Sequence, residues 1–151
     1  MHHDVHLRKM ITEYAQMLST AHRVAGSEST TLYKMTHVNH PCNKWIREQS
    51  GHYLWLFDLY EACINEYEYR HGKIHKSSAL LKELCCPPMD SRRGGWNYPP
   101  LCMPDEYKIP GDAVGSYQRF YRHKKMFDKN GKFMGKYTKR TPPIWFVQDF
   151  I

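Results

Sequence analysis

The sequence of 151 residues lacks any apolar run approaching the roughly 18 residues that a membrane-spanning helix needs. It also lacks a recognisable secretory signal, internal repeats and a shift of composition that would mark a domain boundary. We therefore expect a single cytoplasmic domain over residues 1–151, with no membrane partner.

Cysteines at metal-binding or redox spacing are lacking too. The five cysteines are an odd number, and no C-x-x-C motif occurs among them. This pattern predicts reduced thiols rather than a disulfide framework. His37, His40 and Cys42 lie close together in the sequence, but no fourth ligand and no zinc-finger spacing accompany them. The sequence therefore predicts neither a metal site nor a cofactor.

Acidic residues are in deficit. The chain holds 22 Lys and Arg against 15 Asp and Glu, for a net charge of +7. Residues 112–140 contain nine basic and two acidic residues, an excess of seven that equals the charge of the whole chain. With an aromatic content of 14%, this basic and aromatic C-terminal segment, residues 112–151, favours DNA or a small phosphorylated nucleotide as the partner.

Helical periodicity accounts for most of the sequence. It predicts helices over residues 4–19, 41 to about 50, 52–70, 79–84 and 113–127. Residues 86–110, which contain six of the nine prolines, show no periodicity and are predicted to wrap the helices or to contact a ligand. The fold class expected is all-α, a compact single domain with about four main helices and long irregular connections. Within helix 52–70, Arg70 is expected to face outward.

The first predicted helix has two distinct faces. One is an apolar stripe that includes Leu7, Ile11 and Leu18, and should be buried. The opposite face carries polar side chains at helical spacing: His6, Lys9, Glu13, Gln16 and Thr20. An imidazole, a cation, a carboxylate and an amide on one ridge suit the recognition of a nucleobase and acid–base chemistry on it. The alternative is an ordinary solvated face with a Lys9–Glu13 ion pair.

Ordered motifs along nearly the whole chain resemble a family of uncharacterised phage proteins. These motifs are Asp4-x-His6, Lys9-Met10, Glu13-x-x-Gln16-x-Leu18-x-x-Ala21-His22-Arg23, Asn39-His40-Pro41-Cys42-x-x-Trp45-x-Arg47, Gly51-x-Tyr53-x-Trp55-Leu56, Glu66-Tyr67-x-x-Arg70-x-Gly72-Lys73-x-His75-Lys76, Met103-Pro104-Asp105-Glu106-Tyr107-Lys108 and Lys139-Arg140-x-x-Pro143-x-Trp145-Phe146.

That family is in turn similar to the phage pyrimidine-dimer DNA glycosylase/AP lyase, endonuclease V. The resemblance implies an all-helical fold and assigns to Glu13 the place of the catalytic glutamate, at the same distance from a D-x-H segment. The enzyme's nucleophile is an N-terminal amine on a longer leading segment, whereas three residues precede Asp4 here. Thr12 and Gln16 stand where the enzyme has arginines. A glycosylase that uses water is therefore expected rather than an AP lyase; a start further upstream would restore the missing segment.

Three functions follow as alternatives. The first is a glycosylase-like protein that recognises a nucleobase and cleaves its N-glycosidic bond, with Glu13 and His6 as catalytic residues. The second is a non-catalytic module that sequesters signalling nucleotides of host defence, and the third is a DNA-binding accessory protein. The predicted phosphate-binding residues are Lys9, Gln16, Arg47, Lys139 and Arg140, and those predicted to stack on bases are Trp96, Tyr98 and Trp145. The oligomeric state stays open, a homodimer included.

Overall fold

The computed structural model describes residues 1–88 and 95–147 of the chain. Within these residues the regular elements are helices, and no β-strand occurs; an isolated antiparallel bridge joins Phe127 and Phe133. The predicted all-α class is therefore confirmed. Arg92 and Arg93, which belong to the proline-rich segment 86–110, lie outside the described residues.

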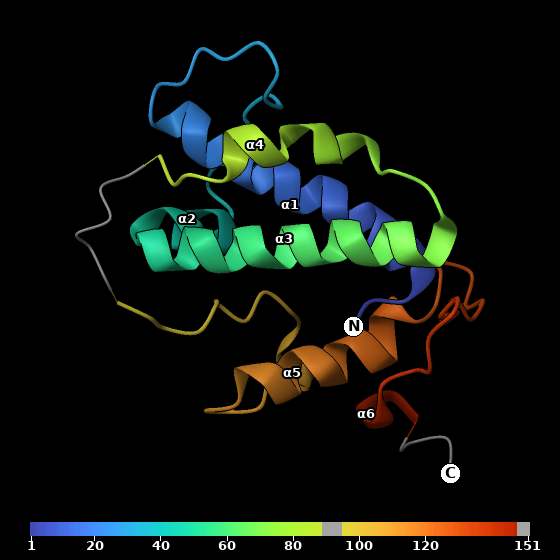
Figure 1. Cartoon of the computed structure of the whole chain (residues 1–151). Helices are drawn as coiled ribbons and strands as arrows, with labels where there is room; N and C mark the ends of the chain where they lie inside the picture. Colours follow the sequence, from blue (N-terminus) through green and yellow to red (C-terminus); the bar gives the residue numbers. More distant parts are fainter. Residues whose placement is uncertain (89–94, 148–151) are drawn as a thin grey trace.

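Two long helices form the centre of the molecule. α1 (Asp4–Val24) and α3 (Ser50–His71) pack against each other, and the shorter α2 (Pro41–Glu48) contacts both. The turn η1 (Lys76–Leu80) and α4 (Leu81–Leu84) cover α1 from another side (Figure 1). The main core between these elements consists mostly of aliphatic and aromatic side chains, including Leu7, Ile11, Leu18, Ile46, Tyr53, Leu56, Tyr60 and Leu84.

Local sequence explains where these helices begin and end. The His3 side chain caps α1, His40 caps α2 and Pro41 occupies the first turn of α2, where its missing N–H costs nothing. α3 ends at Gly72, whose φ of 62° is in the left-handed region that glycine adopts without a side-chain clash.

The C-terminal half of the chain packs on another side of α3. It contains η2 (Asp105–Tyr107), α5 (Ala113–Phe120), the π-helical turn η3 (Tyr121–Lys125) and α6 (Ile144–Val147) (Figure 1). A second, smaller hydrophobic cluster joins Tyr121, Met126, Tyr137 and Phe146, with Trp145 against it. The helix predicted over residues 113–127 is thus regular only to Phe120, after which the wider turn brings Tyr121 into this cluster.

Arg70 corrects one expectation. Predicted to face outward, it is buried, with 2% of the residue exposed. Its Nε donates to Glu66 Oε1 at 2.7 Å, and its Nη1 donates to Asp4 Oδ1 at 3.0 Å and to the His2 carbonyl at 2.9 Å. Residues 136–140 return to cover this end of α3: Thr138 donates its N–H and hydroxyl to Asp4. Helical periodicity carries no information about such a distant segment.

Thr20 corrects a second expectation. It was placed on the polar ridge of the first helix, yet it is buried. Its hydroxyl donates to the Gln16 carbonyl at 2.8 Å and contacts the Thr36 carbonyl at 3.3 Å. The loop that follows α1 folds back over this end of the helix, so the polar ridge of α1 is confined to its first half.

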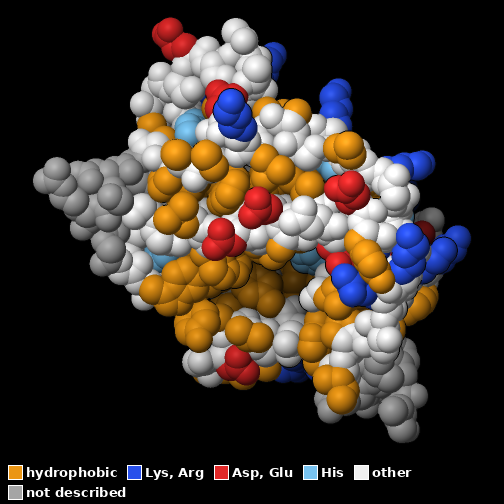
Figure 2. Space-filling model, viewed as in Figure 1, with side chains coloured by type: hydrophobic (Ala, Val, Ile, Leu, Met, Phe, Trp, Pro, Cys, Tyr) orange, Lys and Arg blue, Asp and Glu red, His pale blue; other side chains and the backbone are white. Residues whose placement is uncertain are grey.

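The surface between α3 and α5 is hollowed, with hydrophobic side chains on the floor of the hollow (Figure 2). Burial raises the pKa of Tyr14 of α1. The negative charges that Cys63 of α3, Tyr117 of α5 and Tyr121 would carry raise this pKa further, so groups from both sides lie near Tyr14.

None of the helices in the described part of the chain combines the length and apolar character that a membrane span requires.

Candidate nucleic-acid interface

The start of α1 carries three histidines in contact with one another. His3 Nδ1 accepts a hydrogen bond from the His6 backbone N–H at 3.4 Å, and His3 Nε2 donates to the Lys125 carbonyl at 2.8 Å. These two bonds require the neutral tautomer with the proton on Nε2. Burial lowers the pKa of His3, in agreement with this assignment. His3 therefore connects α1 to the end of the turn η3.

His2 and His6 are also neutral imidazoles in this structure. Burial, followed by the positive charges of neighbouring groups, lowers the pKa of His2 to about 4 and that of His6 to about 2. The His6 ring lies 4.8 Å from the His2 ring and 5.1 Å from that of Tyr121, and His2 Nε2 shares a hydrogen bond with the Tyr14 hydroxyl at 3.0 Å. The cluster thus offers a neutral, polarisable surface beside the first turns of α1.

A pocket of about 240 Å³ opens beside this cluster, and we call it the lysine pocket. Its cationic walls are Lys9 of α1 and Lys124 and Lys125 at the end of η3. The other residues around it are His3, Val5, His6, Phe127 and Met134. Three ammonium groups beside neutral imidazoles make a site suited to a phosphate or another anion.

A second pocket, of about 360 Å³, lies on the other side of the same helical turn and is called here the arginine pocket. Arg8, His71 and Lys73 supply its basic groups, and Asp4, Val5 and Tyr67 complete its lining. The carboxylate of Asp4 is already held by Arg70 and Thr138, which keep its pKa below the usual range although burial acts in the opposite direction. Hence Asp4 is largely neutralised from within the protein.

Val5 lines both pockets and is 43% exposed. The two pockets therefore flank a single turn of α1, with cations on both sides of an exposed apolar side chain. Three backbone donors of this turn are already used: Asp4 N–H donates to the Lys136 carbonyl, His6 N–H to His3 Nδ1 and Leu7 N–H to the His3 carbonyl. Side chains therefore supply most of the groups that an anion could contact here.

Glu13, predicted to be the key carboxylate, lies at the rim of this region. Its carboxylate is 3.1 Å from the Lys9 ammonium, and 41% of the side chain is exposed. The structure thus joins His6, Lys9 and Glu13: the first two line the lysine pocket, and the third pairs with one of them. Gln16 is half-buried one turn further along, and its backbone carbonyl accepts the Thr20 hydroxyl.

The other predicted phosphate-binding residues lie elsewhere, engaged with the protein itself. Arg47 Nη2 donates to the Val38 carbonyl at 2.7 Å. Arg140 donates to both carboxylate oxygens of Glu66 at 2.9 and 2.8 Å, and Lys139 donates to the Tyr69 carbonyl at 3.1 Å. A phosphate at these positions would have to displace these partners.

The predicted stacking residues lie in two places. Trp96 joins an aromatic group at the start of α3, where its ring is 5.6 Å from those of both Trp45 and His52. Tyr98 lies nearby in sequence and is 64% exposed. Trp145 instead packs edge-on against Tyr121, at 6.1 Å, and so belongs to the side of the histidine cluster.

Four cations of the two pockets were not named as site residues from the sequence: Arg8, Lys73, Lys124 and Lys125. Lys124 and Lys125 belong to the basic segment 112–140, so composition pointed to their region but not to their place beside α1. Arg8 adjoins Lys9, and Lys73 follows the glycine that ends α3. Only the packing of η3 and the end of α3 against the first turns of α1 brings the four together.

Comparisons of the chain with models of known protein families, with curated proteins and with solved structures find no match. The geometry of the site is therefore the basis for any functional conclusion.

Proposed function

We propose that the protein binds DNA through the phosphates of a strand that crosses the first turns of α1. The observation that carries this proposal is the pair of cationic pockets that share Val5. Arg8 and Lys73 lie on one side, and Lys9, Lys124 and Lys125 on the other. Two separate anion sites on either side of an exposed apolar residue fit successive phosphates of a polymer better than the contiguous phosphates of one nucleotide.

Neighbouring groups suit the rest of a nucleotide. Phe127 lines the lysine pocket and is 40% exposed, so its ring is available for stacking on a base. The neutral imidazole of His6 adds no charge to the pocket and can exchange hydrogen bonds with a base edge or a sugar. Phosphate contacts would thus give most of the affinity, with few base-specific contacts.

The salt dependence of DNA binding tests this proposal. If all five cations contact phosphates, the logarithm of the binding constant should fall with the logarithm of salt concentration with a slope of about −4.5 on duplex and about −3.5 on single-stranded DNA. Fluorescence anisotropy with a labelled oligonucleotide at several salt concentrations measures that slope. The paired change Lys124→Gln and Lys125→Gln should make the slope less negative by about 1.5 to 2 units.

The matched control changes two exposed lysines that line neither pocket, Lys34→Gln and Lys82→Gln, and removes the same charge. The control should keep the slope of the unaltered protein. Equal effects of the two paired variants would show that only net charge matters and would refute binding at the pockets. Tight binding of a mononucleotide that DNA does not displace would likewise contradict the proposal and favour a nucleotide-sequestering module.

A glycosidic-bond activity is the second candidate, and the contact of Glu13 with Lys9 at the edge of the lysine pocket favours it. In this scheme a bound phosphate pairs with Lys9 and so releases the Glu13 carboxylate. Glu13 would then activate water or stabilise an oxocarbenium-like sugar, and His6 would polarise the base. The hollow between α3 and α5 (Figure 2) would receive the extruded base. This candidate includes the proposed relationship to endonuclease V.

Mass spectrometry of reactions with ultraviolet-irradiated DNA, undamaged DNA and free nucleotides distinguishes binding from cleavage. Release of a free base that is lost in Glu13→Gln, but kept in Glu61→Gln on the exposed face of α3, would establish the activity. Recovery of every substrate intact would eliminate the second candidate and leave the binding proposal standing.

A further inference from the structure

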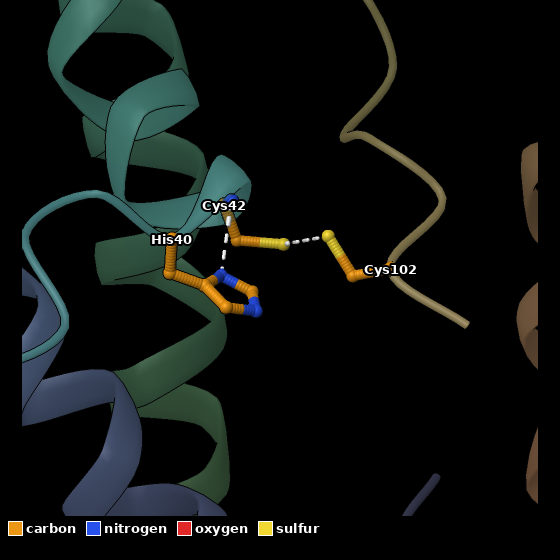
Figure 3. Close-up of side chains that lie close together, drawn as sticks. All are labelled: His40, Cys42 and Cys102. Carbon is orange, nitrogen blue, oxygen red and sulfur yellow. Dashed lines mark hydrogen bonds between the residues drawn. The ribbon is translucent and has the colours of Figure 1, made fainter. Parts of the chain in front are cut away.

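Three potential metal ligands meet where residues 95–110 cross the start of α2. His40 is the cap of α2, Cys42 is its second residue, and Cys102 comes from the irregular segment 60 positions later. The Sγ atoms of Cys42 and Cys102 are 3.5 Å apart, and one ligand atom from each of the three residues lies within 4.8 Å of the other two (Figure 3). His40 and Cys42 are close in the sequence, whereas only the fold brings Cys102 to them.

This spacing is close to that of a tetrahedral zinc site. Zn–S bonds of about 2.3 Å at tetrahedral angles place two sulfurs about 3.8 Å apart, and a sulfur and an imidazole nitrogen about 3.5 Å apart. The two sulfurs already have nearly this separation. His40 is exposed, so its ring can approach by the remaining distance of about 1 Å without disturbing the core.

The Cys42 thiol lies beside the Cys102 thiol and the Tyr117 hydroxyl. Burial and the neighbouring Cys102 raise the pKa of Cys42 to about 12, and the Tyr117 hydroxyl, which also contacts Cys42, is a neutral group. A divalent ion would supply the positive charge, since metal binding deprotonates coordinating thiols.

We infer that His40, Cys42 and Cys102 bind a zinc ion, with water or the Tyr117 hydroxyl as the fourth ligand. Binding releases one proton from each thiol, so the ion and its two thiolates form a neutral unit. His40 Nδ1 now accepts the Cys42 backbone N–H at 3.2 Å, and coordination by either ring nitrogen exchanges this hydrogen bond for a metal bond. The ion would fasten the irregular segment to α2.

Cobalt(II) titration of the reduced protein tests the site, because thiolate-to-cobalt charge transfer reports sulfur ligands directly. We expect one cobalt per chain with absorption of tetrahedral intensity, displaced by zinc. Cys42→Ser and Cys102→Ser should each abolish the charge-transfer band or weaken binding at least tenfold, and His40→Gln should weaken it. Cys85→Ser, which changes an exposed cysteine of the same chain, should bind like the unaltered protein.

Circular dichroism of each variant without metal verifies that the helices are retained, so loss of binding cannot be mistaken for unfolding. Added zinc should also raise the unfolding temperature of the unaltered protein and leave that of Cys102→Ser unchanged. The inference fails if reduced protein gives no thiolate–cobalt band, or if Cys102→Ser keeps it. It fails equally if Cys42 and Cys102 are found as a disulfide that, once reduced, binds no metal.

Discussion

Acidification from pH 7 to pH 5 should destabilise the protein strongly, because the half-buried rings of His2 and His6 are neutral imidazoles in the folded protein. Both have an ordinary pKa of 6.5, and in the folded protein the pKa of His2 is about 4 and that of His6 about 2. The unfolded chain therefore takes up protons below pH 6.5 that the folded chain does not. Stability from each group is full above pH 6.5 and is lost as the pH falls from there toward the folded pKa.

The expected loss follows from the same values. At pH 5 the unfolded state holds about one more proton than the folded state at each of the two rings, and integration from pH 7 gives about 2 kcal/mol per ring. These two rings together contribute about 4 kcal/mol, a large part of the roughly 5–15 kcal/mol by which a typical domain is stable. His3, whose pKa burial also lowers, adds to this loss. Asp4 and Glu66 have lowered pKa values and lose their contribution only at more acidic pH.

Urea denaturation followed by circular dichroism at pH 7, 6 and 5 measures this loss. His6→Gln removes one titrating ring and should reduce the difference in unfolding free energy between pH 7 and pH 5 by about 2 kcal/mol. His123→Gln, which alters an exposed histidine, should leave the difference unchanged. A change below about 1 kcal/mol in the unaltered protein, or an unchanged difference in His6→Gln, would refute the burial of neutral imidazoles.

Two further substitutions test the fold by chemical denaturation. Arg70→Met should lower the unfolding free energy by about 3–5 kcal/mol, because it removes a buried cation from Asp4 and Glu66. Arg140→Met, at the exposed end of the same network, should cost much less. Equal costs would contradict the central place of Arg70. Gly72→Ala should lower the unfolding free energy by about 1 kcal/mol, because Gly72 has a positive φ. Gly51→Ala inside α3 is the control and should not lower it. If Gly72→Ala leaves the unfolding free energy unchanged, the left-handed cap is not required.

The sequence predicted the central helices well because their signals are local. The expected helix over residues 52–70 corresponds to Ser50–His71, and the one beginning at Pro41 ends at Glu48. The first helix continues five residues beyond Ser19, to Val24. Arg23 there donates to the carbonyls of Leu32 and Tyr33, a tertiary contact that no local pattern contains.

The candidate site could be predicted only in part for the same reason. His6, Lys9 and Glu13 share a helix face, so their spacing identified them. Lys124 and Lys125 reach Lys9 because the widened turn after Phe120 changes the direction of the chain, and a helical wheel of residues 113–127 does not show this. The buried position of Arg70 likewise depends on residues that lie far from it in sequence.

The link between Asp4 and Thr138 spans 134 positions, and it also has a consequence for biosynthesis. A ribosome that adds about 5–20 residues per second needs roughly 7 to 27 s to make that stretch. α1 is synthesised early in this interval and Arg70 about halfway through it, but the segment that encloses them is made only at its end. The first helix should therefore stay exposed to chaperones and proteases until residues 136–140 have been made, long after its own synthesis.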